Sequence, residues 1–146
     1  MEKIILVCLS ILAVSCQNPS AEATLVKQQI IETLENETKY FCERNLEKWE
    51  AEWAHQPFCA KMYAGNVGFE NLVGWEPIRQ FAVQHIADRP QPIPLPNPNV
   101  DYDIHLLGET AWVFFTKTID NATMEETRFM VKEGNKWKIA RMQTIY

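Results

Sequence analysis

The sequence predicts an α+β domain in which a long N-terminal helix and two shorter helices pack against an antiparallel sheet. In Ala21–Glu43, apolar residues recur near helical spacing with charged residues between them. From Val100 onward, apolar and polar residues alternate, which is typical of strands with two different faces. Gly134-Asn135 is a two-residue turn of the kind that joins antiparallel strands, so Glu125–Tyr146 should form a hairpin.

The N-terminus has the pattern of an export signal. The apolar run Ile4–Val14 is too short to span a bilayer, which takes about 20 residues. The end of that run, Leu12–Cys16 (LAVSC), resembles the bacterial lipobox, whose cysteine is lipidated after cleavage. We therefore expect a signal peptide over residues 1–15, ending at a lipidated Cys16, and a tether over residues 16–20. The domain would cover residues 21–146 and would be lipid-anchored on the extracytoplasmic side of the bacterial cell envelope; the alternative is a secreted or periplasmic protein.

Charge and cysteine content exclude several classes of partner. A formal net charge of −5 and the lack of a basic run argue against nucleic acid. No CxxC motif or Cys/His cluster indicates a metal site, and we expect no cofactor. Beyond the signal peptide and Cys16, only Cys42 and Cys59 remain, and they could form one disulfide or stay free.

A second, shorter helix should follow the first. Asn45 can cap it, and Trp49 and Trp53 fall on one side with Leu46, which favours a place in the core. The helix should end before Pro57.

Two short strands and a third helix come next. Phe58–Tyr63 and Phe69–Val73 are the predicted strands, separated by a turn. Trp75–Asp88 is the predicted helix, with Pro77 tolerated in its first turn. Proline at every second position from Pro90 then predicts a stiff, extended connector to the sheet.

The predicted hairpin register brings two arginines together. Pairing Glu133 with Lys136 places Arg128 directly opposite Arg141 on a mostly apolar face. Two arginines opposite one another repel, so they need a carboxylate between them or an anion from outside. The hairpin thus points to a pocket for an anion.

Both faces of the predicted sheet are substantially apolar. Extending the register gives one face Tyr102, Val113, Phe115, Arg128, Met130, Ile139 and Arg141, and the other Trp112, Phe114, Phe129, Val131, Ala140 and Met142. One face would meet the helices. The other would meet a second copy of the chain, which predicts a homodimer.

Several motifs resemble known proteins. Gly74–Arg79 (GWEPIR) resembles the start of the third helix in SnoaL-like proteins. Segments 97–100, 108–111, 125–128 and 134–139 match a pattern of the calcium/calmodulin-dependent kinase association-domain group. With the order of the elements, the chain resembles the nuclear transport factor 2-like superfamily over most of residues 21–146. The resemblance implies a cone-shaped, strongly curved antiparallel sheet wrapped around the long helix and the two shorter helices, with a pocket inside and dimers or larger rings outside.

The resemblance also bears on the two arginines. The arginine of the Glu-Glu-Thr-Arg motif, here Arg128, looks toward the pocket in this family. Many members carry His-x-His on the last strand, where this chain has Arg141-Met142-Gln143. Arginine stays charged and binds, whereas histidine can transfer protons near neutral pH.

The first functional hypothesis is a binding domain for a small anionic or carboxylate ligand. Arg128 and Arg141 would clamp the charge, because guanidinium groups suit bidentate recognition. The other candidate pocket residues are Tyr102, Gln143, Trp137, Phe115, Ile139, Trp53 and His55. Alternatively, Glu126, or Glu50 or Glu52, neutralises the arginines, and the filled cone serves as a dimerisation module.

The second hypothesis is an isomerase, dehydratase or cyclase acting on a hydrophobic small molecule. His55, or a glutamate of the first two helices, would be the base, and Tyr102 the proton donor. No known catalytic set of the family has a clear counterpart here, so the sequence leaves the catalytic residues unassigned.

Overall fold

The computed structural model describes residues 19–66, 68–96, 100–119 and 122–146. The predicted signal peptide and the predicted lipidated Cys16 lie outside these residues. No helix in the described ranges is long and apolar enough to cross a membrane.

Three helices and one sheet make up the described chain. The helices are α1 (Pro19–Cys42), α2 (Leu46–Glu50) and α3 (Trp75–Asp88). The strands are β1 (Ala60–Gly65), β2 (Gly68–Val73), β3 (Asp103–Leu107), β4 (Thr110–Ile119), β5 (Ala122–Glu133) and β6 (Lys136–Ile145). They form a six-stranded sheet in the order β2-β1-β6-β5-β4-β3, in which only β1 and β6 pair in parallel.

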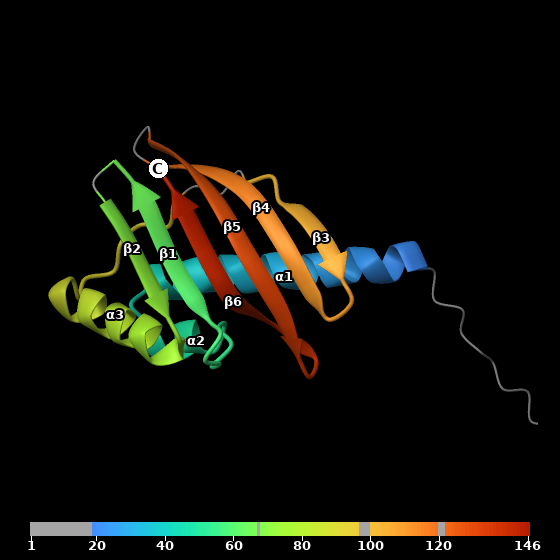
Figure 1. The fold of residues 1–146 in the computed structure, drawn as a ribbon, viewed down its shortest axis with the longest axis horizontal. Helices are drawn as coiled ribbons and strands as arrows, with labels where there is room; N and C mark the ends of the chain where they lie inside the picture. Colours follow the sequence, from blue (N-terminus) through green and yellow to red (C-terminus); the bar gives the residue numbers. More distant parts are fainter. Residues whose placement is uncertain (1–18, 67, 97–99, 120–121) are drawn as a thin grey trace, which may run out of the picture.

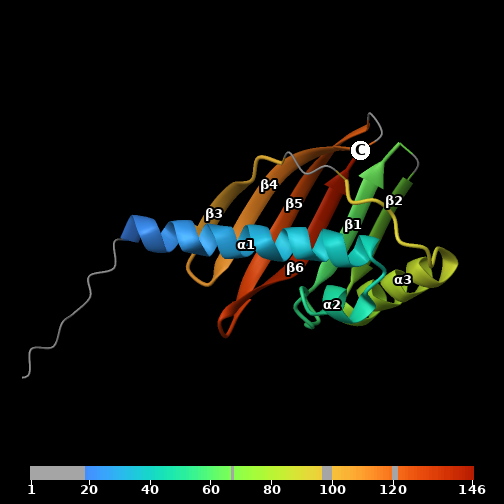
Figure 2. The same cartoon turned by 180° about the vertical axis from the view of Figure 1, so that it is seen from behind.

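The sheet is curved, and α1 crosses one of its faces. Figures 1 and 2 show α1 lying over this face from two sides, with α2 and α3 at the end near β1 and β2. This arrangement confirms the predicted α+β cone. We call the face toward α1 the inner face and the opposite one the outer face.

The long helix packs through the stripe that its sequence predicts. Ile30 and Leu34 are buried, and Thr33 donates a hydrogen bond to the Trp137 carbonyl oxygen at 3.4 Å. Leu25 is 62% exposed, because the first turns of α1 extend past the edge of the sheet (Figure 1). The described part of the helix begins at Pro19.

The predicted aromatic core is confirmed. Asn45 caps α2 by accepting a hydrogen bond from the Lys48 backbone N–H at 3.2 Å. Trp49 and Trp53 are fully or almost fully buried. The chain after α2 then runs beside β6, where backbone hydrogen bonds of 2.9 Å join residues 52 and 54 to Ile139. These bonds fix the tryptophans against the sheet.

The hairpin forms at the predicted turn, but its predicted register is wrong beyond Met130. Met130 pairs with Ile139 as expected, whereas Phe129 pairs with Arg141. A β-bulge at Ala140 adds one residue to β6, and this reverses the faces of all later side chains in that strand. Arg128 consequently lies opposite Met142 rather than Arg141.

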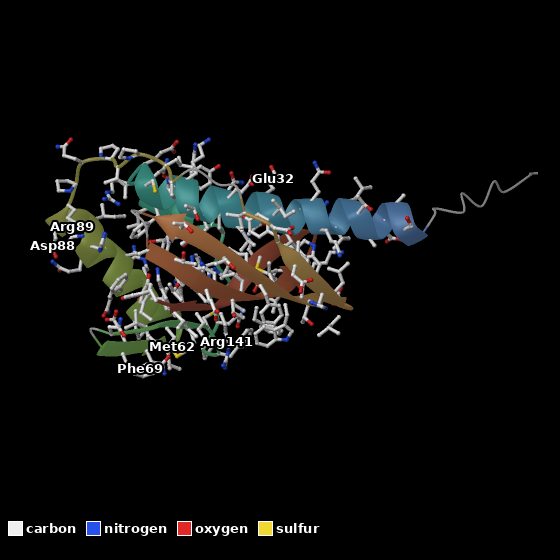
Figure 3. The ribbon with its side chains drawn as sticks, turned by 90° about the horizontal axis from the view of Figure 1, so that it is seen from above. Glu32, Met62, Phe69, Asp88, Arg89 and Arg141 are labelled. Carbon is white, nitrogen blue, oxygen red and sulfur yellow. The ribbon has the colours of Figure 1, made fainter. Side chains whose placement is uncertain are left out.

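The bulge exchanges inner and outer residues of β6. Met142 and Thr144 are buried, while Arg141 is exposed. Figure 3 shows Arg141 and Met62 on the side of the sheet away from α1. Glu32, also labelled there, belongs to α1 and marks the helix side. The predicted single face holding both arginines does not exist.

The described part of the proline-rich connector, residues 89–96, forms neither helix nor strand, and it is fixed to the end of α1. The Ile93 backbone N–H donates to the Cys42 carbonyl oxygen at 3.1 Å, and Arg44 Nε donates to the Gln91 carbonyl oxygen at 3.1 Å. These bonds hold residues 91–96 beside the inner face of the sheet.

Candidate functional site

A cavity of about 580 Å³ lies between α1, the inner face of β1, β5 and β6, and the proline-rich connector. Its volume falls in the range of small-molecule sites, about 300–1,000 Å³. Apolar side chains such as Phe41, Met124 and Met142 form much of its wall. The charged side chains that line it are Glu37, Lys61, Lys117, Glu126 and Arg128.

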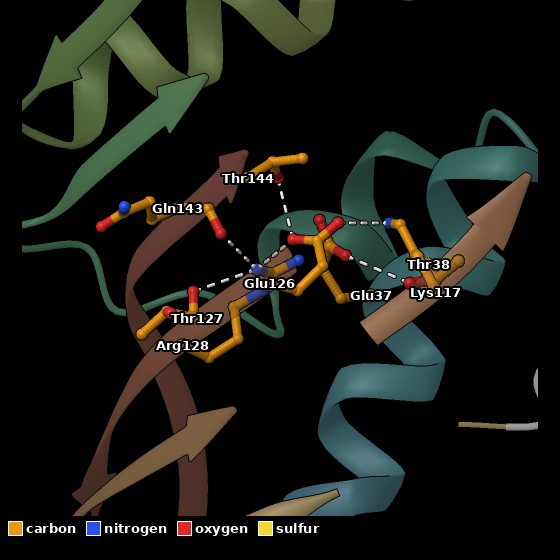
Figure 4. Close-up of polar contacts among 8 residues, drawn as sticks. All are labelled: Glu37, Thr38, Lys117, Glu126, Thr127, Arg128, Gln143 and Thr144. Carbon is orange, nitrogen blue, oxygen red and sulfur yellow. Dashed lines mark hydrogen bonds and ion pairs between the residues drawn. The ribbon is translucent and has the colours of Figure 1, made fainter. Parts of the chain in front are cut away.

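Glu126 is the centre of a buried ion-pair network (Figure 4). It is 2% exposed, and its two carboxylate oxygens lie 2.6 Å from Arg128 Nη1 and 2.7 Å from Lys117 Nζ. Thr144 donates a further hydrogen bond to it at 2.8 Å. Burial raises the pKa of Glu126, but the charges of Arg128 and Lys117 outweigh burial and hold the pKa below its ordinary value of 4.5. Glu126 is therefore a fixed anion.

Arg128 is bound within the protein through one of its terminal guanidinium nitrogens. Besides Glu126, its Nη1 donates to the Thr127 carbonyl oxygen at 3.0 Å and approaches that of Gln143 at 3.4 Å (Figure 4). Its guanidinium group lies 5.2 Å from the centre of the Phe115 ring. The proposed neutralisation by Glu126 thus occurs for this arginine, although a cavity remains beside the pair.

Glu37 is a second buried acid on the cavity wall. Trp49 Nε1 donates a hydrogen bond to it at 2.8 Å, and the Thr38 hydroxyl approaches it at 3.5 Å. The sequence reasoning missed this residue. Its position three residues after Leu34 and four before Phe41 places it on the apolar stripe of α1, which was a usable signal.

Lys61 is the cation that the sequence reasoning did not find. Its side chain enters the cavity wall from β1, opposite Met142, and the residue is 2% exposed. Five aromatic rings surround its ammonium group at 5.2–5.8 Å from their centres, those of Phe41, Trp49, Trp53, Tyr63 and Phe81. Within the described ranges no carboxylate lies within 4.0 Å of it.

Solved structures with the same architecture exist. A cystatin-like fold protein from Burkholderia xenovorans is similar with a TM-score of 0.62 and 19% identity, over 88% of this chain and 92% of that one. An NTF-2-like protein of unknown function from Shewanella oneidensis is similar with a TM-score of 0.57 and 16% identity, over 83% and 99% of the two chains. The chain has the nuclear transport factor 2-like fold. No protein-family model and no curated protein matches its sequence. The similarity therefore supports the fold alone.

The nuclear transport factor 2-like cone brings only some of the predicted site residues together. Arg128 lines the cavity, and Phe115 packs against its guanidinium group. Tyr102 lies 5.0 Å from Phe115, measured between ring centres, and lines an adjoining cavity of about 340 Å³. Burial, followed by the charge of Glu35, raises the pKa of Tyr102 to about 12, so its hydroxyl stays protonated.

The remaining predicted residues lie elsewhere in the cone. Arg141 and Gln143 line a groove on the outer face, so neither can join Arg128 in a clamp. His55 is exposed, with its ring stacked 4.0 Å from that of Trp75. Trp53 and Trp137 are core residues whose indole N–H groups have no hydrogen-bond acceptor in the described part of the chain.

The helix glutamates of the alternative hypotheses are also apart from Arg128. Glu50 forms an ion pair of 2.8 Å with Arg79 of α3. Glu52 lies near the β5–β6 turn, where burial raises its pKa despite the opposing charge of Lys138.

Both cysteines of the domain are buried free thiols. Cys42 lines the cavity, and Cys59 donates a hydrogen bond to the Ala54 carbonyl oxygen at 2.8 Å. Burial raises the pKa of both thiols, so they are poor nucleophiles at neutral pH. Within the described ranges no group of three or more acidic, cysteine or histidine side chains could hold a metal ion.

Proposed function

We propose that this chain is a lipid-anchored, extracytoplasmic domain that binds a small molecule with an anionic end inside the cone. The observation that carries this proposal is the charge of the cavity wall. Three cationic side chains, Lys61, Lys117 and Arg128, face two acidic ones, Glu37 and Glu126. A buried excess of one positive charge is costly unless an anion compensates for it.

Binding fits the cavity better than the alternative isomerase, dehydratase or cyclase activity. Such an enzyme needs a base that can accept a proton near neutral pH. Glu126 is unsuited because its two cations keep it ionised, and Tyr102 has no hydrogen-bonded partner in the described ranges. The predicted base His55 lies outside the cavity.

Native mass spectrometry of the chain, purified gently from cells that produce it, tests the proposal. We expect the folded protein to carry an additional small-molecule mass. Met124→Trp should lower the fraction of protein that carries this mass, because the larger side chain takes up part of the cavity. Arg141→Ala, on the outer face, should retain it and serves as the matched control. A wild-type protein without added mass, or an added mass that Met124→Trp carries to the same extent as the wild type, would contradict binding in the cone.

We also propose that the chain forms a homodimer through the outer face of the sheet, as its sequence predicts, and the same spectrum tests this. Trp112, Phe114 and Phe129 form an aromatic cluster on the outer face, with ring centres 4.9 Å apart for Trp112–Phe129 and 6.2 Å for Trp112–Phe114. Trp112 and Phe114 are exposed, as an uncovered interface would be. A dimer at micromolar concentration is the expected species, and a monomer would remove this part of the proposal.

The lipid anchor is tested separately through Cys16. In cells, the wild-type protein should sediment with membranes and carry acyl chains on its first mature residue. Cys16→Ala should appear in the soluble fraction, whereas Cys42→Ala should fractionate like the wild type. If Cys16→Ala still sediments with membranes, the lipoprotein assignment is wrong.

A further inference from the structure

Lys61 lines the cavity, and within the described ranges its ammonium group forms no ion pair with an acidic side chain. Lys61 lies on β1 between its neighbours in the sheet, Leu72 of β2 and Met142 of β6. The residue is only 2% exposed to solvent. Aromatic rings from α1, α3, β1 and the α2 region surround the ammonium group. Ring faces attract a cation, so they keep the side chain in place.

The hydrogen-bonding capacity of Lys61 is nevertheless unused. An ammonium group has three N–H donors, and aromatic rings are weak acceptors for them. No oxygen or nitrogen in the described part of the chain accepts a hydrogen bond from Lys61 Nζ. A buried charge is expected to have both a counter-charge and hydrogen bonds, and the missing partner must come from the cavity side.

The other cations of the cavity are already neutralised. Arg128 and Lys117 both pair with Glu126 at 2.6–2.7 Å, so the three side chains carry one positive charge between them. Glu37, hydrogen-bonded to Trp49, can offset that charge within the cavity. Lys61 is then the one lining side chain of the described residues whose charge has no counterpart.

We infer that the ligand is an apolar monocarboxylic acid whose carboxylate pairs with Lys61 at the inner end of the cavity. This inference rests on the proposed function. A single negative charge balances the cavity, whereas a phosphate monoester or a dicarboxylate would bury a second, unpaired charge. The rest of the wall accepts an apolar chain, because Met124, Met142 and Leu95 line it. Methionine side chains are flexible and adapt to such a chain.

Three probes of equal chain length test the inference: octanoate, octanol and octyl phosphate. Their binding to the purified chain is followed by tryptophan fluorescence, since Trp49 and Trp53 lie beside Lys61. We expect octanoate to bind at least about tenfold more tightly than the other two, which is the effect of one well-placed ion pair. Lys61→Met should remove this preference by weakening octanoate about tenfold while leaving octanol within about twofold. Lys48→Met, which removes an exposed lysine 5.4 Å from the Tyr40 ring centre, should change neither affinity.

Stability separates a ligand-binding role from a structural one. Removing an uncompensated buried charge should leave the melting temperature of Lys61→Met equal to or above that of the wild type. If Lys61→Met unfolds, Lys61→Gln supplies the same comparison with a neutral polar side chain. A variant that keeps the preference for octanoate overturns the inference, as does tighter binding of octanol or octyl phosphate. If a cell-derived mass is retained but no octanoate binds, the inference is wrong and the proposed function stands; if neither is found, the proposed function fails.

Discussion

Replacing Glu126 with glutamine is expected to lower the free energy of unfolding by about 3–5 kcal/mol. The substitution keeps the shape of the side chain but removes the negative charge between Arg128 and Lys117. Arg128 is buried, so its charge would be left without its carboxylate partner. Urea denaturation, followed by circular dichroism, measures the loss.

Glu125→Gln is the matched control for this substitution. It changes the same residue type at the neighbouring position of β5, where the side chain is exposed. Its effect should stay within about 0.5 kcal/mol. Replacing Glu126 and Arg128 together by leucine and methionine should recover part of the loss, because no unpaired arginine remains. A loss below about 1 kcal/mol for Glu126→Gln would show that the network is not a main source of stability.

The same carboxylate should make the protein sensitive to acid. Its pKa in the folded state lies below the ordinary value of 4.5, so the unfolded chain binds the proton more readily. The stability contributed by Glu126 is therefore complete above the unfolded pKa and is lost as the pH falls through the folded pKa. Urea midpoints measured downward from pH 6 should fall more steeply for the wild type than for Glu126→Gln.

Local patterns predicted most of the secondary structure. The span of α3 and the Gly134-Asn135 turn agree with the sequence prediction, because helix starts and two-residue turns depend on a few neighbouring residues. The buried tryptophans followed from their spacing after Asn45. These features need no knowledge of distant segments.

The site could not be predicted to the same extent because it depends on the face each strand residue takes. The bulge at Ala140 has no local signal such as a glycine or proline, and it moves Arg141 and Gln143 to the outer face. For Lys61 the sequence suggests the opposite of what the structure shows. A lysine in a short strand suggests a side chain exposed to solvent, and only the pairing of β1 with β6 shows that this one faces inward. The inner face therefore carries Lys61 instead of Arg141, the cation that the sequence predicted there, because one inserted residue changes the face of every later residue in β6.

Replacing Trp49 with alanine is expected to lower the free energy of unfolding by about 3–5 kcal/mol. The side chain is fully buried, and its ring centre lies 5.7 Å from that of Trp53 and 6.0 Å from those of Phe41 and Trp75. Rings from α1 and α3 meet on it, so the truncation leaves a cavity that the surrounding elements cannot close. Phe69→Ala, which removes an exposed ring on β2, should cost less than about 0.5 kcal/mol.

Trp49→Phe separates the packing of the ring from its hydrogen bond. The phenyl ring retains much of the packing but cannot donate the 2.8 Å hydrogen bond to Glu37, which leaves a buried acid without its best donor. We expect a loss of about 1–3 kcal/mol for this variant. Glu37→Leu in the Trp49→Phe background should then cost less than Glu37→Leu alone, because leucine cannot accept the indole hydrogen bond and the two residues act as a pair. Additive losses in urea denaturation would mean that Trp49 stabilises the cone through its volume alone, and that Glu37 is held by other groups of the cavity.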